Sequence, residues 1–129
     1  MESRAEIELL LKNYQYLIKS QQITESTQKN GRKVLIVKLI FSNESKLDAF
    51  ESEWNEKHKY QYQWMRQDNS LLISWGNDAH HPEISTHPNH KHVGNRQNVQ
   101  PSEEMNLGKI LSYIAQIIGI LLILAWFFW

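Results

Sequence analysis

The C-terminal stretch constrains the fold of this chain more than any other feature of the sequence. Residues 110–129 read ILSYIAQIIGILLILAWFFW, twenty residues without a charge. A helix of about this length crosses the hydrocarbon core of a bilayer, and Lys109, Trp126 and Trp129 are residue types that favour a membrane interface. The sequence therefore indicates a possible transmembrane segment at 110–129.

The same stretch can also be interpreted as a helix of the protein core. Ser112, Tyr113 and Gln116 give its first two turns one polar side, as expected of a helix that packs against protein. From Ile117 onward no polar side chain follows, and a helix that is apolar all round needs lipid or a partner. We therefore divide the chain into a single domain at 1–109 and an apolar helix at 110–129.

The remaining composition indicates one small cytoplasmic domain, anchored to a membrane if residues 110–129 span one. Fourteen basic and fourteen acidic side chains cancel, so an anionic ligand must be met by a local patch rather than by a global field. The chain has no cysteine, which excludes disulfides and thiolate metal sites and fits a reducing compartment. The N-terminus has no long apolar run, so we expect no signal peptide, and nothing implies a cofactor.

Hydrophobic periodicity predicts a helix followed by a strand in the first third of the chain. Apolar residues recur at helical spacing from Ile7 to Ile18. After the polar stretch QQITESTQKNG, Asn30 and Gly31 predict a two-residue hairpin turn, because both residue types tolerate positive φ. The β-branched run KVLIVKLIF at 33–41 predicts a strand buried on both faces.

The middle of the chain predicts further strands. Residues 46–54 fit either a helix or a strand, whereas 59–64 alternate and place Tyr60, Tyr62 and Trp64 on one face. QDNS at 67–70 predicts a turn, and LLISW after it predicts a short strand.

The segments that follow predict a loop and a second helix. Residues 93–101 are typical of a loop, with 95–101 as a plausible linker, and Ser102 is suited to cap a helix that begins at Glu103. The chain is thus predicted to be an α+β protein. Its antiparallel β-meander of four to five strands lies between an N-terminal helix and a C-terminal helix that runs into the apolar tail.

Five of the six histidines lie in HHPEISTHPNHKH at 80–92, within a His-rich loop predicted at 78–96. Adjacent side chains on extended backbone point to opposite faces, so His80 and His81 are poorly placed to share a metal ion, whereas His90 and His92 would share a face. The spacing matches no standard zinc pattern. We therefore assign no metal ligands from the sequence.

Histidine titrates near neutral pH and serves as acid or base. Cleavage of RNA by its own 2′-hydroxyl needs a base, an acid for the leaving oxygen and a cation for the phosphate. The candidate acids and bases are His80, His81, His90 and His92. The candidate RNA-binding residues are Lys91 and Arg96 for phosphate and Tyr60, Tyr62 and Trp75 for base stacking. The candidate supporting residues are Asn77, Asp78 and Glu83.

A structural interpretation of the same residues stays open. In that interpretation the histidines of a solvated, proline-containing loop hydrogen-bond turns and the sheet. The corresponding function is a non-catalytic interaction module, tethered to the membrane by 110–129, with a structural or metal-binding histidine loop.

The chain resembles the TumE family of small toxins from toxin–antitoxin pairs. The resemblance covers roughly residues 33–118, and the His-Lys-His block is its most specific part. It is carried by Trp75, Asn77, His80, His81, Pro82, Thr86, Pro88, His90, Lys91, His92, Val93, Gly94, Pro101, Ser102, Glu103 and Glu104. The chain departs from the family pattern at four places. Gly76 stands where the family usually has an acid, and Asp78-Ala79 replaces Ala-Pro. His87 takes an aromatic position, and Asn89 takes a histidine position. The tail beyond about Ile118 is unlike the family.

The resemblance implies a growth-inhibiting toxin of a type II system that acts on RNA. It also implies an antitoxin partner, expected to be a helix-turn-helix protein encoded in the same operon. It carries no assigned catalytic residues, so we choose His90 and His92 as first candidates for acid and base on chemical grounds, with His80 and His81 supporting them and Lys91 on the phosphate.

Overall fold

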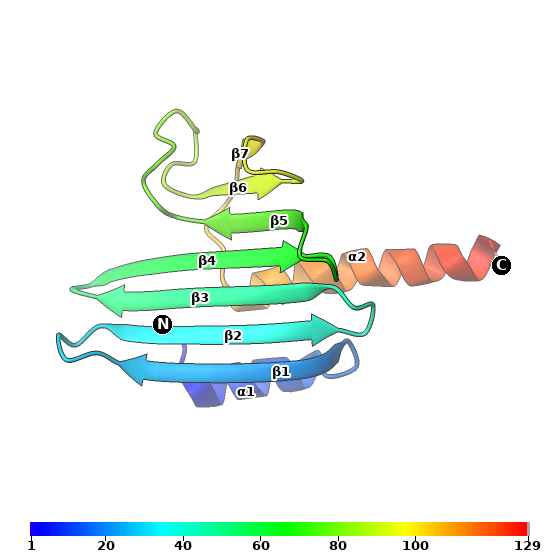
Figure 1. The fold of residues 1–129 in the computed structure, drawn as a ribbon, viewed down its shortest axis with the longest axis horizontal. Coiled ribbons are helices and arrows are strands. Elements are labelled where there is room, and N and C mark those ends of the chain that lie inside the picture. Colours follow the sequence, from blue (N-terminus) through cyan, green and yellow to red (C-terminus); the bar gives the residue numbers. More distant parts are fainter. Residues whose placement is uncertain (129) are drawn as a thin grey trace.

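The computed structural model describes residues 1–128 as a single antiparallel sheet with two helices on one of its faces (Figure 1). The described elements are α1 (Arg4–Asn13), β1 (Ile18–Thr27), β2 (Lys33–Phe41), β3 (Lys46–Trp54), β4 (Lys57–Met65), β5 (Leu71–Gly76), β6 (His90–Val93), β7 (Val99–Pro101) and α2 (Leu107–Phe128). Each strand pairs with the next along the chain. The α+β class is confirmed, but the described residues form seven strands rather than four or five.

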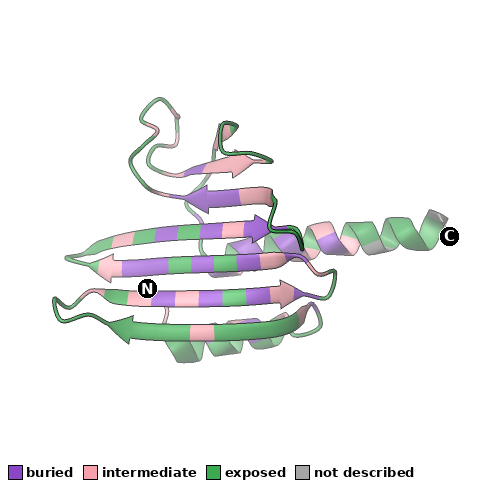
Figure 2. Ribbon diagram, viewed as in Figure 1, coloured by how far each residue is buried: buried purple, intermediate pink, exposed green. Residues whose placement is uncertain are grey.

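The two faces of the sheet differ in burial because the strand residues alternate. On β4, Tyr60, Tyr62 and Trp64 are buried together, as predicted, and they face the helices. On β2, Leu35 and Val37 are buried on that covered face, whereas Lys38 is exposed on the other. The prediction that residues 33–41 are buried on both faces is therefore wrong, because no helix covers the open face of the sheet (Figures 1 and 2).

Both edge regions contain strands that hydrophobic periodicity did not predict. The polar stretch after α1 is β1, which pairs with β2 along its length. Residues 99–101, predicted as part of a linker, form β7 against β6. The turn before β2 also differs from its prediction. Gly31 alone has positive φ (87°), while Gln28 N–H donates to Arg32 O at 2.8 Å, so this is a longer loop closed by a left-handed glycine.

The second helix begins later than predicted. Ser102 does not cap a helix at Glu103, because the chain first passes Tyr60, whose hydroxyl accepts a hydrogen bond from Met105 N–H at 3.3 Å. The residue before the helix is Asn106, whose Oδ1 accepts from Lys109 N–H at 2.8 Å. This side-chain oxygen satisfies one of the free N–H groups of the first turn.

Helix α2 has a packed first half and an exposed second half. Leu107, Ile110, Leu111, Ile114 and Ile118 are buried against the sheet together with Ile7 and Leu11 of α1. The core therefore extends to Ile118 rather than ending at residue 109. Beyond it, the helix projects past the edge of the sheet with exposed apolar side chains (Figure 2). These are Ile120, Leu121, Ile123, Leu124, Trp126 and Phe127. Trp129 lies outside the described residues.

The length of the exposed half bears on the membrane prediction. By length and composition Leu107–Phe127 is apolar enough to cross a bilayer, and it is the one such helix in the described residues. Its first half, however, is part of the core. Residues 119–128 rise about 15 Å as a helix, which is half of a hydrocarbon core of roughly 30 Å. These ten residues alone are therefore too short to span that core.

We expect a chain that ends at Ile118 to be folded and soluble, and the full chain to pellet with membranes. Truncation removes no residue that is buried among those whose burial the structure describes, whereas each apolar side chain that leaves water gains about 1.5–3 kcal/mol. Fractionation with alkaline carbonate washing, together with circular dichroism of the shorter chain, measures both results. Full-length protein that stays monodisperse without detergent would contradict this expectation.

Candidate functional site

Two histidines of β6 lie on the open face of the sheet. His90 pairs with Gly76 of β5, and His92 pairs with Ser74. Between them in β5 is Trp75, whose ring meets Tyr113 of α2 edge-on at 5.7 Å between centroids. Since neighbouring strand residues point to opposite faces, His90 and His92 point away from the helices. Their predicted shared face is confirmed.

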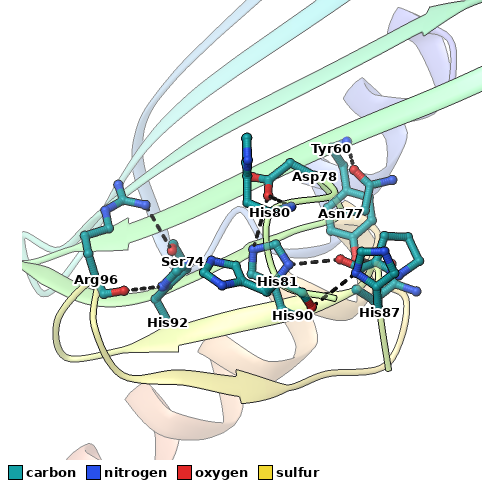
Figure 3. Close-up of polar contacts among 12 residues, drawn as sticks. Tyr60, Ser74, Asn77, Asp78, His80, His81, His87, His90, His92 and Arg96 are labelled. Atoms are coloured by element: carbon teal, nitrogen blue, oxygen red, sulfur yellow. Dashed lines mark hydrogen bonds and ion pairs between the residues drawn. The ribbon is translucent and has the colours of Figure 1, made fainter. Parts of the chain in front are cut away.

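A third histidine joins them from the β5–β6 loop (residues 77–89). The ring centroid of His81 lies 5.0 Å from that of His90 and 5.5 Å from that of His92, and the last two are 5.2 Å apart (Figure 3). One ring nitrogen of each lies within 4.8 Å of the other two. We call His81, His90 and His92 the histidine cluster. The ring of His80 is exposed and lies outside it.

Hydrogen bonds orient all three rings through Nδ1. His90 Nδ1 donates to the carbonyl oxygen of Pro88 at 2.9 Å, and His92 Nδ1 donates to that of Arg96 at 2.8 Å. His81 Nδ1 lies 3.2 Å from the Glu83 carboxylate. Each ring is therefore held from outside the cluster, with Nε2 left for chemistry.

The three rings differ in access to solvent. The side chain of His90 is 3% exposed and that of His81 is 27% exposed. Burial lowers the pKa of the half-buried His92, although its hydrogen bond to Arg96 O acts in the opposite direction. His92 is therefore neutral at neutral pH, with an Nε2 able to accept a proton. The hydrogen bond from its own backbone N–H and that from His81 lower the pKa of Glu83, so this carboxylate is ionised beside His81.

The predicted supporting residues hold the loop and add one charge. Asp78 Oδ1 lies 3.9 Å from His90 Nε2 and accepts from His80 N–H at 3.3 Å. Asn77 bridges to β4, where its Oδ1 accepts from Tyr60 N–H at 3.0 Å and its amide donates to His58 O at 2.9 Å.

The far end of the loop is held by hydrogen bonds that the sequence did not predict. Tyr60 donates its hydroxyl proton to Asn89 Oδ1 at 2.8 Å. Thr86 donates to Asn89 O at 2.6 Å and accepts from Ser102 N–H at 3.0 Å. Thr86 belongs to the family pattern, which was the one signal available for it, and its contacts show that it orders the loop.

The two predicted phosphate-binding cations lie on opposite faces. Arg96 lies on the open face, where its guanidinium donates to Gln63 Oε1 at 2.9 Å and reaches Ser74 Oγ at 3.5 Å. Lys91 pairs with Trp75 and points to the covered face. The prediction that Lys91 meets phosphate beside the histidines is therefore wrong, because alternation places it on the other side of β6.

The three aromatic residues proposed for base stacking are buried. Tyr60, Tyr62 and Trp75 are 3%, 0% and 4% exposed under the helices, so no ring face is free for a base. The exposed aromatic residues of the open face were missed. Phe50 is 39% exposed and Trp54 is 38% exposed. Both alternate in sequence with the residues of β3 that face the helices, and this alternation was the available signal.

A cationic pocket lies on the open face around Trp54. Its volume is about 160 Å³, and it is lined by Arg32, Ser52, Trp54, Lys57 and Lys59. The Arg32 guanidinium carbon lies 5.2 Å from the centre of the Trp54 ring. Although the chain has no net charge, this pocket is a local patch that suits an anion with an aromatic group.

The model of the family described as Toxin TumE matches residues 7–118. The chain belongs to the TumE toxin family. It is therefore a toxin of the toxin–antitoxin class, which implies an antitoxin partner. Nothing matches the chain in the comparisons with curated proteins and with solved structures. The family match ends at Ile118, which is also the last buried residue of α2 among those whose burial is described, so the exposed apolar half of that helix lies outside the match.

We expect Tyr60→Phe to destabilise the toxin by about 1–3 kcal/mol, because it leaves Asn89 and the Met105 N–H without their buried partner. Tyr16→Phe is the matched control, since Tyr16 is 72% exposed and its change should stay within about 0.5 kcal/mol. Urea denaturation measures both variants. Equal unfolding midpoints would show that the Tyr60 hydroxyl does not hold the loop.

Proposed function

We propose that the toxin cleaves RNA on the open face of its sheet, with the histidine cluster as the centre of the reaction. The observation that carries the proposal is the convergence of three imidazoles, each oriented through Nδ1, beside an arginine. This arrangement offers proton acceptors, proton donors and a cation at one place. These are the groups that cleavage by a 2′-hydroxyl needs.

We assign the roles according to access and charge. His92, neutral and half-buried, takes the proton of the 2′-hydroxyl as its oxygen attacks phosphorus. His81, which lies beside the Glu83 carboxylate, gives a proton to the leaving 5′-oxygen when it carries one on Nε2. His90, at 3% exposure, positions the other two rings instead of meeting the substrate. This replaces our sequence-based choice of His90 as a first candidate.

Arg96 is the proposed phosphate-binding residue. Gln63 and Ser74 hold its guanidinium on the open face, and His92 donates to its carbonyl oxygen. The base and the cation are thus fixed to one another. An arginine held in this way can give two parallel hydrogen bonds to a phosphate.

The open face also supports binding of the flanking nucleotides. Phe50, Gln61, Gly76 and His90 form one row across β3 to β6. Three strand spacings separate Phe50 from His90, about 14 Å in all. A base stacked on Phe50 or beside Trp54 would place its strand along this row, with Lys57 and Lys59 close to the backbone.

The exposed half of α2 favours a second candidate function, attachment of the toxin to a membrane or to another apolar surface. Its side chains are apolar all round from Ile120 to Phe127 among the described residues. This function concerns location rather than catalysis. It is tested by the truncation at Ile118, which leaves the histidine cluster intact.

We expect His81→Ala and His92→Ala each to lower RNA cleavage by about a hundredfold or more, since each removes a group that transfers a proton. His80→Ala is the matched control, because its ring lies outside the cluster on the same loop. Cleavage of total RNA by purified variants is measured with a chelator present, and circular dichroism checks their fold. Full toxicity and full RNA cleavage by a folded protein that carries both His81→Ala and His92→Ala would contradict the assignment.

We expect co-expression of the neighbouring gene to restore growth and to yield a complex in which the histidine cluster is covered. An antitoxin that blocks the site must exclude RNA from the open face. Protection of the β5–β6 loop from hydrogen exchange in the complex is the measurement. A chain that is harmless alone and binds no product of its own operon would oppose the proposed helix-turn-helix partner.

A further inference from the structure

Hydrogen bonds to groups outside the histidine cluster determine which ring nitrogen carries the proton. Nδ1 of His90 and Nδ1 of His92 each donate to a main-chain carbonyl, at 2.9 and 2.8 Å. A carbonyl oxygen can only accept, so Nδ1 carries the proton in both rings. The acceptor for His81 Nδ1 is the carboxylate of Glu83, at 3.2 Å. In a neutral imidazole with this tautomer, Nε2 has a free lone pair.

One ring nitrogen of each histidine lies within 4.8 Å of the other two (Figure 3). Since each Nδ1 bonds outward, we assign these nitrogens as Nε2. The ring planes cross at 67° to 88°, so edges meet rather than faces. Ligand nitrogens around tetrahedral zinc lie about 3.3 Å apart. Small rotations of the three rings, together with a small shift of the loop that carries His81, would bring the nitrogens to that spacing.

We propose that the histidine cluster is a zinc site, with Nε2 of His81, His90 and His92 as its three ligands. Three lone pairs directed at one point repel each other, and a single cation between them satisfies all three. Zinc suits three neutral imidazoles with a fourth position left open. The oxygen acceptors on Nδ1 are the partners that orient histidines around bound metal ions.

Asp78 lies beside the fourth position. Its Oδ1 is 3.9 Å from His90 Nε2, and its side chain is 52% exposed, so this side of the cluster faces solvent. A zinc-bound water would have the carboxylate of Asp78 as its hydrogen-bond acceptor. Gly76, across from His90, adds no side chain at this point.

Zinc binding and proton transfer compete for the same atoms. An Nε2 atom bound to zinc neither takes nor gives a proton, so zinc would silence the cleavage proposed above. This consequence rests on the proposed function, whereas the zinc site does not. The two are separated by measuring metal binding directly and cleavage in a chelator.

The test is calorimetric titration of the full-length protein, stripped with a chelator, with zinc chloride. We expect one ion per chain. His81→Ala and His92→Ala should each weaken binding about a hundredfold or more, because loss of a ligand exceeds the 10–100-fold cost of losing an outer partner. His90 is not the test residue, since its burial makes an alanine there a threat to the fold.

Two controls separate the cluster from other histidines. His80→Ala and His58→Ala should bind zinc as the parent does, since the first ring lies outside the cluster and the second is paired with Glu51. Cobalt(II) bound to the parent should give the visible absorption of a tetrahedral site. The proposal is overturned if the parent binds no zinc, or if folded His81→Ala and His92→Ala proteins bind it as tightly as the parent.

Discussion

The side chain of Tyr60 connects the parts on which the site depends. Its hydroxyl donates to Asn89 at one end of the β5–β6 loop and accepts from Met105 on the way into α2. Its backbone N–H donates to Asn77 at the other end of the loop. Because buried polar groups must be paired, none of these segments can shift without leaving a buried group unsatisfied. The loop that carries His81 is thereby held by the sheet and by the start of α2.

Much of the fold could be predicted from local pattern, and the parts that could not depend on tertiary pairing. The alternation of Tyr60, Tyr62 and Trp64 indicated a one-sided strand, and the structure confirms it. Apart from Ile18 and Ile23, which pack against the core, strand β1 is polar, so its residues carry little periodic signal. It forms by pairing with the edge of β2. Strand β7 is short and likewise forms by pairing with the edge of β6.

The candidate site was also predicted only in part, because local pattern indicates some of its residues and tertiary contacts position the others. Period-two alternation placed His90 and His92 on one face, and the sheet confirms this. The same rule, applied to Lys91, would have placed that residue on the covered face with Trp75. The position of His81 has no such rule. It depends on how the loop folds back through Asn77 and Thr86, which spacing along the chain does not encode.

The absence of a side chain at Gly76 matters for the histidine cluster, because Gly76 pairs with His90 across the sheet. A Cβ at residue 76 would lie 3.9 Å from His90 Nε2, so an acid there would place its carboxylate against the histidine cluster. In this chain Asp78 brings its Oδ1 to 3.9 Å from the same nitrogen. A negative charge beside these imidazoles favours a proton or a cation on them. Asp78 of the loop thus supplies the histidine cluster with an acidic neighbour.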